Sequence, residues 1–260
     1  MTQHISRRAV ARGAAWSIPA VTVAGAAPAL AVSAGCTSGP VTVNLGAGTR
    51  TILTTGSSGM PSKIQWAYTD TKTGVTVTIT TTAIGSTILG RRTGYAVDSY
   101  VDSDLMHDGT GFNIQHVTRS GSAPGTGGEG ESVTISFTRK GAPVSVTNFA
   151  MNIDDIDTKS GNWTDGVILT SGAVAAAKAS DIDGNGAAGN ATYTAGPWHN
   201  AYTTPGSNDA ADRLTLTAPS ISSLGFDYIN VPKVNGMTSA GTNADQNIQL
   251  TGMTFQAPAC

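Results

Sequence analysis

The four-residue stretch Asp154–Asp157 contains three carboxylates, at Asp154, Asp155 and Asp157, and a fourth follows at Asp165. Carboxylates this close in sequence repel one another at neutral pH, so a compensating charge is expected near them. Ca²⁺ suits such a cluster, because it takes six to eight oxygen ligands from Asp, Asn and backbone carbonyls. We therefore expect a calcium site at these four Asp residues. The alternative is that they are solvated turn formers that accept hydrogen bonds from backbone amides.

A second acidic loop begins at Asp181 and continues through Asp183 and Asn185, with a glycine after each of the last two. This spacing matches the opening of an EF-hand calcium loop, but the twelfth position, which requires a bidentate Glu, is Thr192. A plain turn is therefore the simpler interpretation. Asp181, Asp183 and Asn185 remain secondary candidates for holding a cation.

Aromatic residues suggest a different kind of site. Trp198, His199 and Tyr202 stand in a stretch rich in Gly and Pro, which predicts a loop. Exposed rings beside amides and carboxylates are typical of sugar-binding surfaces, because rings stack on pyranose faces while polar groups bind hydroxyls. We expect these three residues to contact a carbohydrate ligand. The alternative is that the tryptophan fills the core, as tryptophans in strands usually do.

Catalytic patterns are sparse in this chain. It has neither the GxSxG nucleophile elbow nor the HExxH zinc motif, and His107, His116 and His199 stand in separate segments. A glycoside hydrolase needs two facing carboxyl groups, and spacing alone does not show which acidic pair would face a sugar. We expect a protein without enzymatic activity, with a carboxylate-dependent glycoside hydrolase as an alternative.

The elements that must position these residues are β-strands. After the first 34 residues the chain is rich in Thr, Ser, Gly and Val and poor in Leu, Lys and Glu, which favours short strands and tight turns. Apolar and polar residues alternate along 75–80, 133–137 and 214–217, so one face of each strand is expected inside and the other in water. The sequence predicts an all-β fold, a single antiparallel β-sandwich of jelly-roll-like or immunoglobulin-like type over residues 35–260.

Two predicted strands change the phase of their alternation. In 144–153 and in 248–255, the apolar residues shift from one alternating set to the other partway along the strand. A β-bulge in each strand would return the later side chains to the inner face. The alanine-rich stretch 172–180 is the single candidate for a short helix.

The first 34 residues predict export from the cytoplasm. Arg7, Arg8 and Arg12 precede an apolar stretch that ends in small residues, as in a signal peptide cleaved after Ala34. Ser6 followed by the paired arginines matches the twin-arginine export signal, which passes folded proteins. An ordinary secretion signal that contains two arginines is the alternative. Residues 1–34 are thus expected to be a removable signal peptide of the twin-arginine type.

The charge balance of the remaining chain excludes two classes of partner. Removing three leader arginines lowers the basic residues from 15 to 12, against 17 acidic ones. Because the Lys and Arg residues are scattered, neither nucleic acid nor an anionic membrane surface is an expected partner. After the leader there is no uninterrupted apolar run of about 18 residues, so no transmembrane segment is expected.

The two cysteines, Cys36 and Cys260, stand just after the leader and at the last position. In an oxidising compartment the simplest prediction is a disulfide between them, because the termini of compact domains often lie close together. The alternative is lipidation of Cys36, since Ala34-Gly35-Cys36 matches the end of a lipobox, although Ser33 replaces the usual Leu. Lipidation would leave Cys260 unpaired.

Short motifs carry a family resemblance. The pattern FxxxxDDID at Phe149–Asp157 and the pattern WxDxV at Trp163–Val167 resemble the jelly-roll modules of bacterial surface proteins. Together with the leader SRRAVARGAAW and the two cysteines, they resemble actinobacterial secreted or surface β-sandwich proteins with a twin-arginine leader. The resemblance implies extracellular residence and calcium rather than an activity.

We therefore expect a secreted or cell-surface binding or adhesion module, stabilised by Ca²⁺, with a glycan or another envelope protein as its partner. A purely structural envelope or matrix protein is the alternative from a different class.

Overall fold

The computed structural model describes residues 37–56, 59–92, 100–101, 104–107, 109, 111–117, 130–159, 163–188, 196–201, 210–231 and 245–259. The chain divides into two units, residues 1–34 and 35–260, and all the described residues belong to the second. The leader, Tyr202, Cys36 and Cys260 therefore lie outside the described residues. Among the helices of the described part, none is long and apolar enough to cross a membrane.

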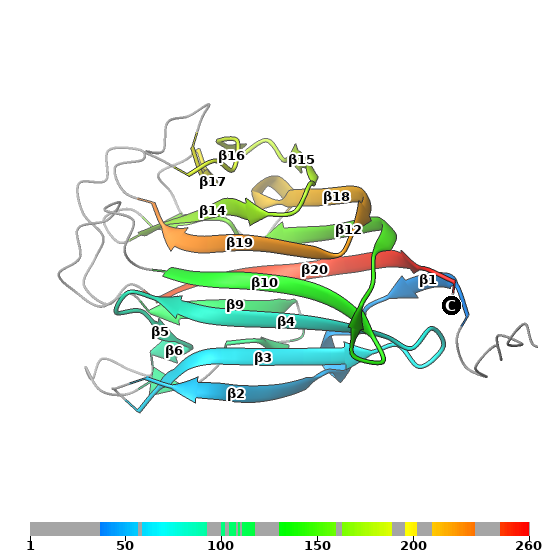
Figure 1. Cartoon of the computed structure of the whole chain (residues 1–260). Helices are drawn as coiled ribbons and strands as arrows, with labels where there is room; N and C mark the ends of the chain where they lie inside the picture. The colour runs from blue at the N-terminus through cyan, green and yellow to red at the C-terminus, as the bar shows by residue number, and fades with distance from the viewer. Residues whose placement is uncertain are drawn as a thin grey trace, which may run out of the picture. The chain divides into compact units, whose positions relative to one another are not determined.

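The described residues form two large antiparallel sheets that face each other (Figure 1), which confirms the all-β sandwich. The eight strands of the first, sheet A, are β1 (Gly39–Thr42), β5 (Ile88–Leu89), β8 (Met106–His107), β9 (Phe112–Val117), β12 (Val146–Asp154), β15 (Ala175–Lys178), β18 (Leu214–Ile221) and β20 (Asp245–Ala257). The ten strands of the second, sheet B, are β2 (Thr49–Thr55), β3 (Pro61–Thr69), β4 (Val75–Ile84), β10 (Gly130–Arg139), β11 (Ala142–Pro143), β13 (Thr158–Lys159), β14 (Trp163–Ser171), β16 (Ile182–Asp183), β17 (Trp198–Asn200) and β19 (Ser223–Asn230).

A few short elements complete the described fold. Strands β6 (Arg91–Arg92) and β7 (Tyr100–Val101) pair with each other, and two short 3-10 helices occur, η2 (Leu45–Ala47) and η3 (Ala210–Asp212). The strand order is β15-β18-β12-β20-β9-β5 in sheet A and β16-β17-β14-β19-β10-β4-β3-β2 in sheet B. Strand β15 thus forms one edge of sheet A.

The core lies between the two sheets and follows directly from the alternation in the sequence. In β4, Val75, Val77 and Ile79 are fully buried, while the threonines between them are partly exposed. The same alternation buries Val133, Ile135 and Phe137 of β10. Apolar burial contributes about 25 cal/mol per Å², so these alternating side chains supply most of the force that holds the sheets together.

Both predicted bulges are present. The pairing of β12 with β20 shifts register between Thr147 and Asn152, and Asn148 adopts φ +49° within the shifted stretch. In β20, Gly252 has φ +60°, a backbone conformation that glycine adopts without a steric penalty. Beyond these two residues, the inward positions again carry buried apolar side chains: Phe149, Met151, Ile153, Met253 and Phe255.

The helix expected within 172–180 is wrong, because Ala175–Lys178 forms strand β15. Gly172 has φ +94°, so the chain turns sharply before this segment instead of entering a helix. The segment then pairs with β18 from Ala175–Thr217 to Lys178–Leu214. Pairing with an existing sheet therefore outweighs the helix propensity of alanine.

Candidate functional site

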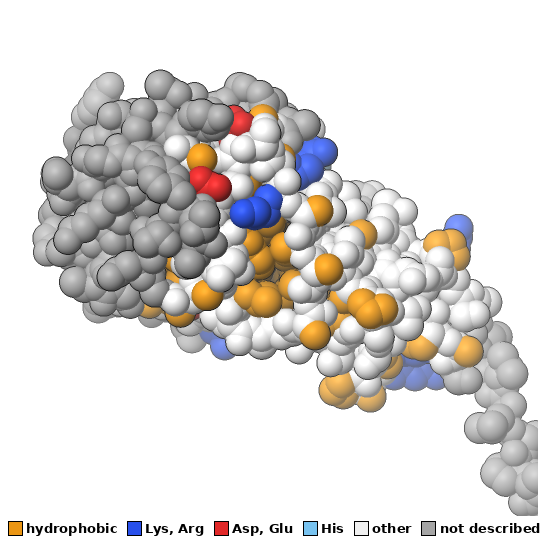
Figure 2. Space-filling view, turned by 90° about the horizontal axis from the view of Figure 1, so that it is seen from above, with side chains coloured by type: hydrophobic (Ala, Val, Ile, Leu, Met, Phe, Trp, Pro, Cys, Tyr) orange, Lys and Arg blue, Asp and Glu red, His pale blue; other side chains and the backbone are white. Residues whose placement is uncertain are grey.

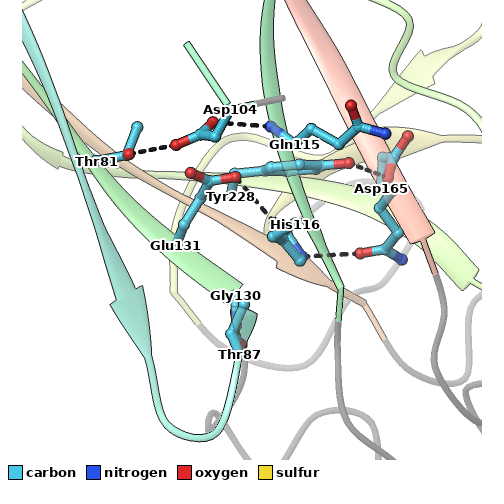
Figure 3. Close-up of polar contacts among 10 residues, drawn as sticks. Thr81, Thr87, Asp104, Gln115, His116, Gly130, Glu131, Asp165 and Tyr228 are labelled. Atoms are coloured by element: carbon cyan, nitrogen blue, oxygen red, sulfur yellow. Dashed lines mark hydrogen bonds and ion pairs between the residues drawn. The ribbon is translucent and has the colours of Figure 1, made fainter. Parts of the chain in front are cut away.

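A cluster of polar side chains closes one end of the sandwich, between the two sheets, where β10 begins (Figure 3). In each strand, the cluster residue stands two positions beyond the last inward-facing apolar residue, so its side chain also faces inward. His116 follows Ile114 in β9, Glu131 precedes Val133 in β10, and Gln246 precedes Ile248 in β20. Further members, added in the same way, are Thr81 of β4, Asp165 of β14 and Tyr228 of β19. The cluster is therefore the last, polar layer of the core.

His116 lies at the centre of this cluster and links the two sheets. Its Nδ1 is 3.1 Å from Glu131 Oε1, and its Nε2 is 3.1 Å from Gln246 Oε1. Both ring nitrogens therefore lie within hydrogen-bond distance of a side-chain oxygen, one from each sheet. The ring of Tyr228 packs against the imidazole with centroids 4.6 Å apart. All four side chains are inaccessible or almost inaccessible to water.

Asp104 adds a second buried carboxylate beside Glu131. Thr81 Oγ1 donates to its Oδ2, the Gln115 amide donates to its Oδ1 over 3.0 Å, and Arg50 Nε donates to its backbone carbonyl. Burial raises the pKa of Asp104 well above its ordinary value, and the negative charge of Glu131 raises it further. Burial also raises the pKa of Glu131. These acids hold protons to a higher pH than exposed carboxyls do.

Asp165 and Tyr228 form the other half of the polar layer. The Tyr228 hydroxyl donates to Asp165 Oδ1 over 2.6 Å, and the Asp157 amide donates to Asp165 Oδ2 over 3.2 Å. Burial raises the pKa of Asp165, and the nearby charge of Asp157 adds to this shift. Burial together with the Asp165 charge likewise raises the pKa of Tyr228. Both carboxylate oxygens of Asp165 therefore accept a hydrogen bond from within the protein.

The structure does not bring the four predicted calcium ligands together. Asp154 receives Arg213 Nε over 2.6 Å and Thr251 Oγ1 over 2.6 Å, whereas the Asp155 carboxylate receives Asn247 Nδ2. Asp157 and Asp165 contact each other at the start of β14. Within the described ranges, no three His, Cys, Asp or Glu side chains are grouped so as to hold a metal ion. β12 ends at Asp154, and the carboxylates of Asp154 and Asp155 bond to different protein partners, so calcium binding stays a prediction.

The secondary loop is a turn held by its own backbone. Ser180 Oγ donates to Asp181 Oδ1, and Asn185 Oδ1 accepts the amides of Ala187 and Gly196 over 3.1 and 3.0 Å. Asp183 lies in β16, opposite His199 of β17. Asn185 thus uses its side-chain oxygen for turn formation, as the simpler interpretation expected.

The expected exposed aromatic platform at Trp198 and His199 is also wrong, because both residues lie in strand β17 and are buried. Trp198 is only 5% exposed, and its indole belongs to the hydrophobic core. Its neighbour His199 points to the other face of the sheet, where Nδ1 lies 2.8 Å from the Pro197 carbonyl. Burial lowers the pKa of His199. Neither ring offers a face on which a sugar could stack.

Trp198 nevertheless borders a hollow of about 670 Å³ between the edges of the two sheets. Leu169 and Trp198 line it from sheet B, and Val174, Ala176 and Lys178 line it from the side of β15. Residues 184–187 of the turn after β16 complete the lining. Figure 2, seen from the side of β15, shows recessed hydrophobic side chains next to Lys or Arg side chains. Its volume falls within the range of about 300–1,000 Å³ typical of ligand pockets.

Two hydrogen-bond donors are held at the border of this hollow. Lys178 Nζ donates to the Gly184 carbonyl over 2.9 Å, which leaves two further ammonium hydrogens to donate. Asn185 uses its oxygen for the turn, so its amide nitrogen is the group that it presents outward. Among the described residues, the lining contains no acidic side chain. The hollow therefore offers an apolar floor with donors and one positive charge at its border.

A second, smaller hollow differs in its lining from the hollow beside Trp198. A space of about 240 Å³ lies beside Asn44, His107 and Thr251, on the part of the molecule near η2 and β8. Among the described residues, its lining combines glycines and polar groups with a few aliphatic side chains and the imidazole of His107. It lacks the combination of apolar floor and charged border found at Trp198.

Sequence reasoning missed both the polar layer and the hollow. The polar layer had a usable signal, because Glu131, His116 and Gln246 continue the inward phase of alternating strands. The hollow had none, since it depends on how the edge of one sheet faces the edge of the other.

No protein-family model matches this chain, and no curated protein matches it. Among solved structures, the adhesin domain of PrgB from Enterococcus faecalis is similar to it, with 11% sequence identity and a TM-score of 0.38. That alignment covers 83% of this chain and 71% of the adhesin domain. Because similarity at this level supports no inference, the fold and the site rest on the strands and contacts of this chain alone.

Proposed function

We propose that this protein is an exported, non-enzymatic surface module that binds its ligand in the hollow beside Trp198. The observation that carries the proposal is the hollow itself, which joins an apolar floor to fixed donors at an open edge of the sandwich. Export is supported by the leader at residues 1–34, with its paired arginines and apolar stretch. A partner on the cell envelope would meet such a module from outside.

The polar layer supports a structural role rather than a catalytic one. Its His116, Glu131 and Asp104 side chains are fully buried and bonded to neighbouring groups. Neither of the two hollows described above includes any of these three residues in its lining. A substrate would have to reach them through the core, so these groups are better suited to closing the sandwich than to catalysis.

The experiment compares the purified full-length chain with the variant Ala176→Trp on an immobilised glycan array and an immobilised peptide array. Ala176 lines the hollow and is exposed, so an indole at this position fills the space without disturbing the core. The matched control is Ala177→Trp, which adds the same bulk to the other face of the same exposed strand. We expect the wild type and the control to bind one of the arrays and Ala176→Trp to lose at least about tenfold in affinity. Binding to neither array, or equal binding by Ala176→Trp, would overturn the proposal.

A further inference from the structure

The backbone of β15 has one paired side and one open side. Ala179 N donates to Arg213 O over 3.0 Å, in register with the β15–β18 pairs Ala175–Thr217 and Ala177–Thr215. Because alternate residues of an antiparallel ladder bond to the same neighbour, Ala175, Ala177 and Ala179 direct their N–H and C=O groups toward β18. Ala176 and Lys178 must then direct theirs away from the sheet. Among the described residues, β15 pairs with no strand other than β18.

The hollow lies directly beside this open edge. The side chains of Ala176 and Lys178 line it from sheet A, and Leu169 and Trp198 line it from sheet B. Small residues keep it empty, since Ala176 supplies only a methyl group and Gly186 supplies no side chain. A Cβ on Gly186 would come within 2.5 Å of the indole, so the turn backbone itself covers the Trp198 ring. What remains is a slot that needs side chains from elsewhere to fill it.

We propose that an extended polypeptide segment binds by adding a strand to sheet A along β15, with its alternate side chains entering the hollow. The inference rests on the proposed function and names the ligand class of that same site. Two features of the β15 edge favour a polypeptide ligand. The outward N–H and C=O groups of Ala176 and Lys178 match the donors and acceptors of a neighbouring strand. Alternate residues of that strand, about 6.6–6.8 Å apart, would place apolar side chains against Leu169 and Val174, which are partly exposed in the hollow.

The positive charge of Lys178 indicates which side chains the bound segment should carry. Lys178 is the charged residue in the lining of the hollow, so an acidic residue or a terminal carboxylate next to it would be favoured. A second copy of the chain is a poor fit, because its own β15 offers only Ala and Lys side chains to an apolar slot. Two copies would also bring their Lys178 ammonium groups toward each other. The fitting occupant is an apolar, alternating segment with one acidic residue.

The test uses synthetic ten-residue peptides with Val or Ile at alternate positions and one terminal Asp, each compared with a scrambled peptide of the same composition. The key variant is Ala176→Pro, which removes the outward N–H while leaving the bonds of Ala175 and Ala177 to β18 in place. Proline is compatible with an edge strand when the missing N–H faces outward. The control Ala176→Ser keeps that N–H. We expect the alternating peptides to bind wild type and Ala176→Ser, and to lose at least about tenfold in affinity with Ala176→Pro and when scrambled.

A second readout follows the backbone directly. Hydrogen exchange by NMR should slow at least about tenfold at the Ala176 and Lys178 amides when peptide is added, while the paired Ala175 and Ala177 amides stay as they are. Lys178→Glu should shift the preference from peptides with Asp to peptides with Lys, and Lys178→Gln should weaken both. No binding of any alternating peptide, equal binding by Ala176→Pro, unchanged exchange at Ala176 and Lys178, or pairing of two copies through β15 would each overturn the inference. Glycan binding that is lost in Ala176→Trp and retained in Ala176→Pro would overturn it too, yet would leave the proposed function intact.

Discussion

The end of the sandwich at Glu131 and the open edge at β15 differ in which polar groups they hold and where these groups point. The closed end holds buried side chains bonded to one another, although Glu131 Oε2 and Gln246 Nε2 have no hydrogen-bond partner among the described residues. At the closed end, His116 joins Glu131 to Gln246, and Tyr228 holds Asp165, all without access to water. At the open edge, two of the four residues of β15, Ala176 and Lys178, direct their backbone groups away from the sheet, beside a hollow of about 670 Å³. The titratable side chains of the polar layer thus face the interior, whereas the alanines of β15 are exposed.

This contrast separates stability from binding. Buried polar groups that are bonded to each other fix one arrangement of a core, and removing one partner is costly. An edge with unpaired backbone groups and space beside it costs little to change and is available to a partner. Acidic side chains close in sequence therefore indicate the structural end of this protein, and the alanine-rich edge indicates its binding surface.

The largest change in the free energy of unfolding is expected from removing the proposed disulfide. Strand β1 pairs with the end of β20 up to Gly39–Ala257, three residues from Cys36 and Cys260, which lie outside the described residues. The disulfide predicted between these two cysteines stays a proposal, supported by the pairing of β1 with β20. Cys36→Ser should lower the free energy of unfolding by up to about 5 kcal/mol, measured by urea denaturation. Intact mass should increase by two hydrogen atoms on reduction, whereas a diacylglyceryl adduct on Cys36 would contradict the pairing.

Breaking the polar layer comes next. Glu131→Ala removes the hydrogen-bond partner of His116 Nδ1 in a fully buried setting. Leaving a buried polar group without its partner costs about 1–3 kcal/mol, so a loss of this size in the free energy of unfolding is expected from urea denaturation. Ala176→Trp, placed at the open edge, should change it by no more than about 0.5 kcal/mol. A cost below about 1 kcal/mol for Glu131→Ala would remove the contrast between the two regions.

The polar layer should also set how stability depends on pH. Burial raises the pKa of Asp104, Glu131 and Asp165 above the ordinary values of 3.8 and 4.5. Between the ordinary and the raised values the folded protein binds more protons than the unfolded chain, so the free energy of unfolding falls as pH rises through this window. The slope is about 1.4 kcal/mol per pH unit for each proton difference. Their stabilising contribution is thus complete below the ordinary pKa values and is lost as pH rises through the raised ones.

His199 works in the opposite direction. Burial lowers its pKa from 6.5, so its contribution grows as pH rises to that value. Urea denaturation between about pH 4 and pH 8 measures the sum, in which three carboxyls oppose one imidazole. Glu131→Gln should flatten the decrease. Stability that increases steadily over this range would show that these carboxyls are not the controlling groups.

The smallest effect is expected from calcium. Asp154 already binds Arg213 and Thr251, and Asp155 binds Asn247, so no set of free carboxylates awaits an ion in this stretch. Thermal melting with about 1 mM Ca²⁺ should match melting with chelator. A site with an affinity near 0.1 mM would instead add about 1.4 kcal/mol, and such a shift would restore the calcium site that the acidic cluster suggested.

The sequence predicted the fold more fully than the site, for physical reasons. Alternation in β4 and β10 identifies their inner faces, and the phase shifts at Asn148 and Gly252 identify the two bulges, because burial imposes a period of two on every strand. The helix expected around Ala175 fails because local propensity is weaker than pairing with β18. These are properties of single strands and their neighbours.

The site depends on distances that no single strand contains. Asp154 accepts hydrogen bonds from Arg213 and Thr251, which are 59 and 97 residues away in sequence. A local cluster of acidic residues therefore does not reveal which side chains will bind it. Trp198 was expected in an exposed loop, because the surrounding Gly and Pro residues concealed the short strand β17. The hollow exists only because β15 is the last strand of its sheet.

The most direct measurement compares array binding and urea denaturation for Ala176→Trp and Glu131→Gln side by side. The account predicts that Ala176→Trp loses binding by at least about tenfold with unchanged stability, and that Glu131→Gln keeps binding while its stability and pH dependence change. If Glu131→Gln loses binding while Ala176→Trp keeps it, the polar end is the binding site and the assignment of roles to the two regions is reversed.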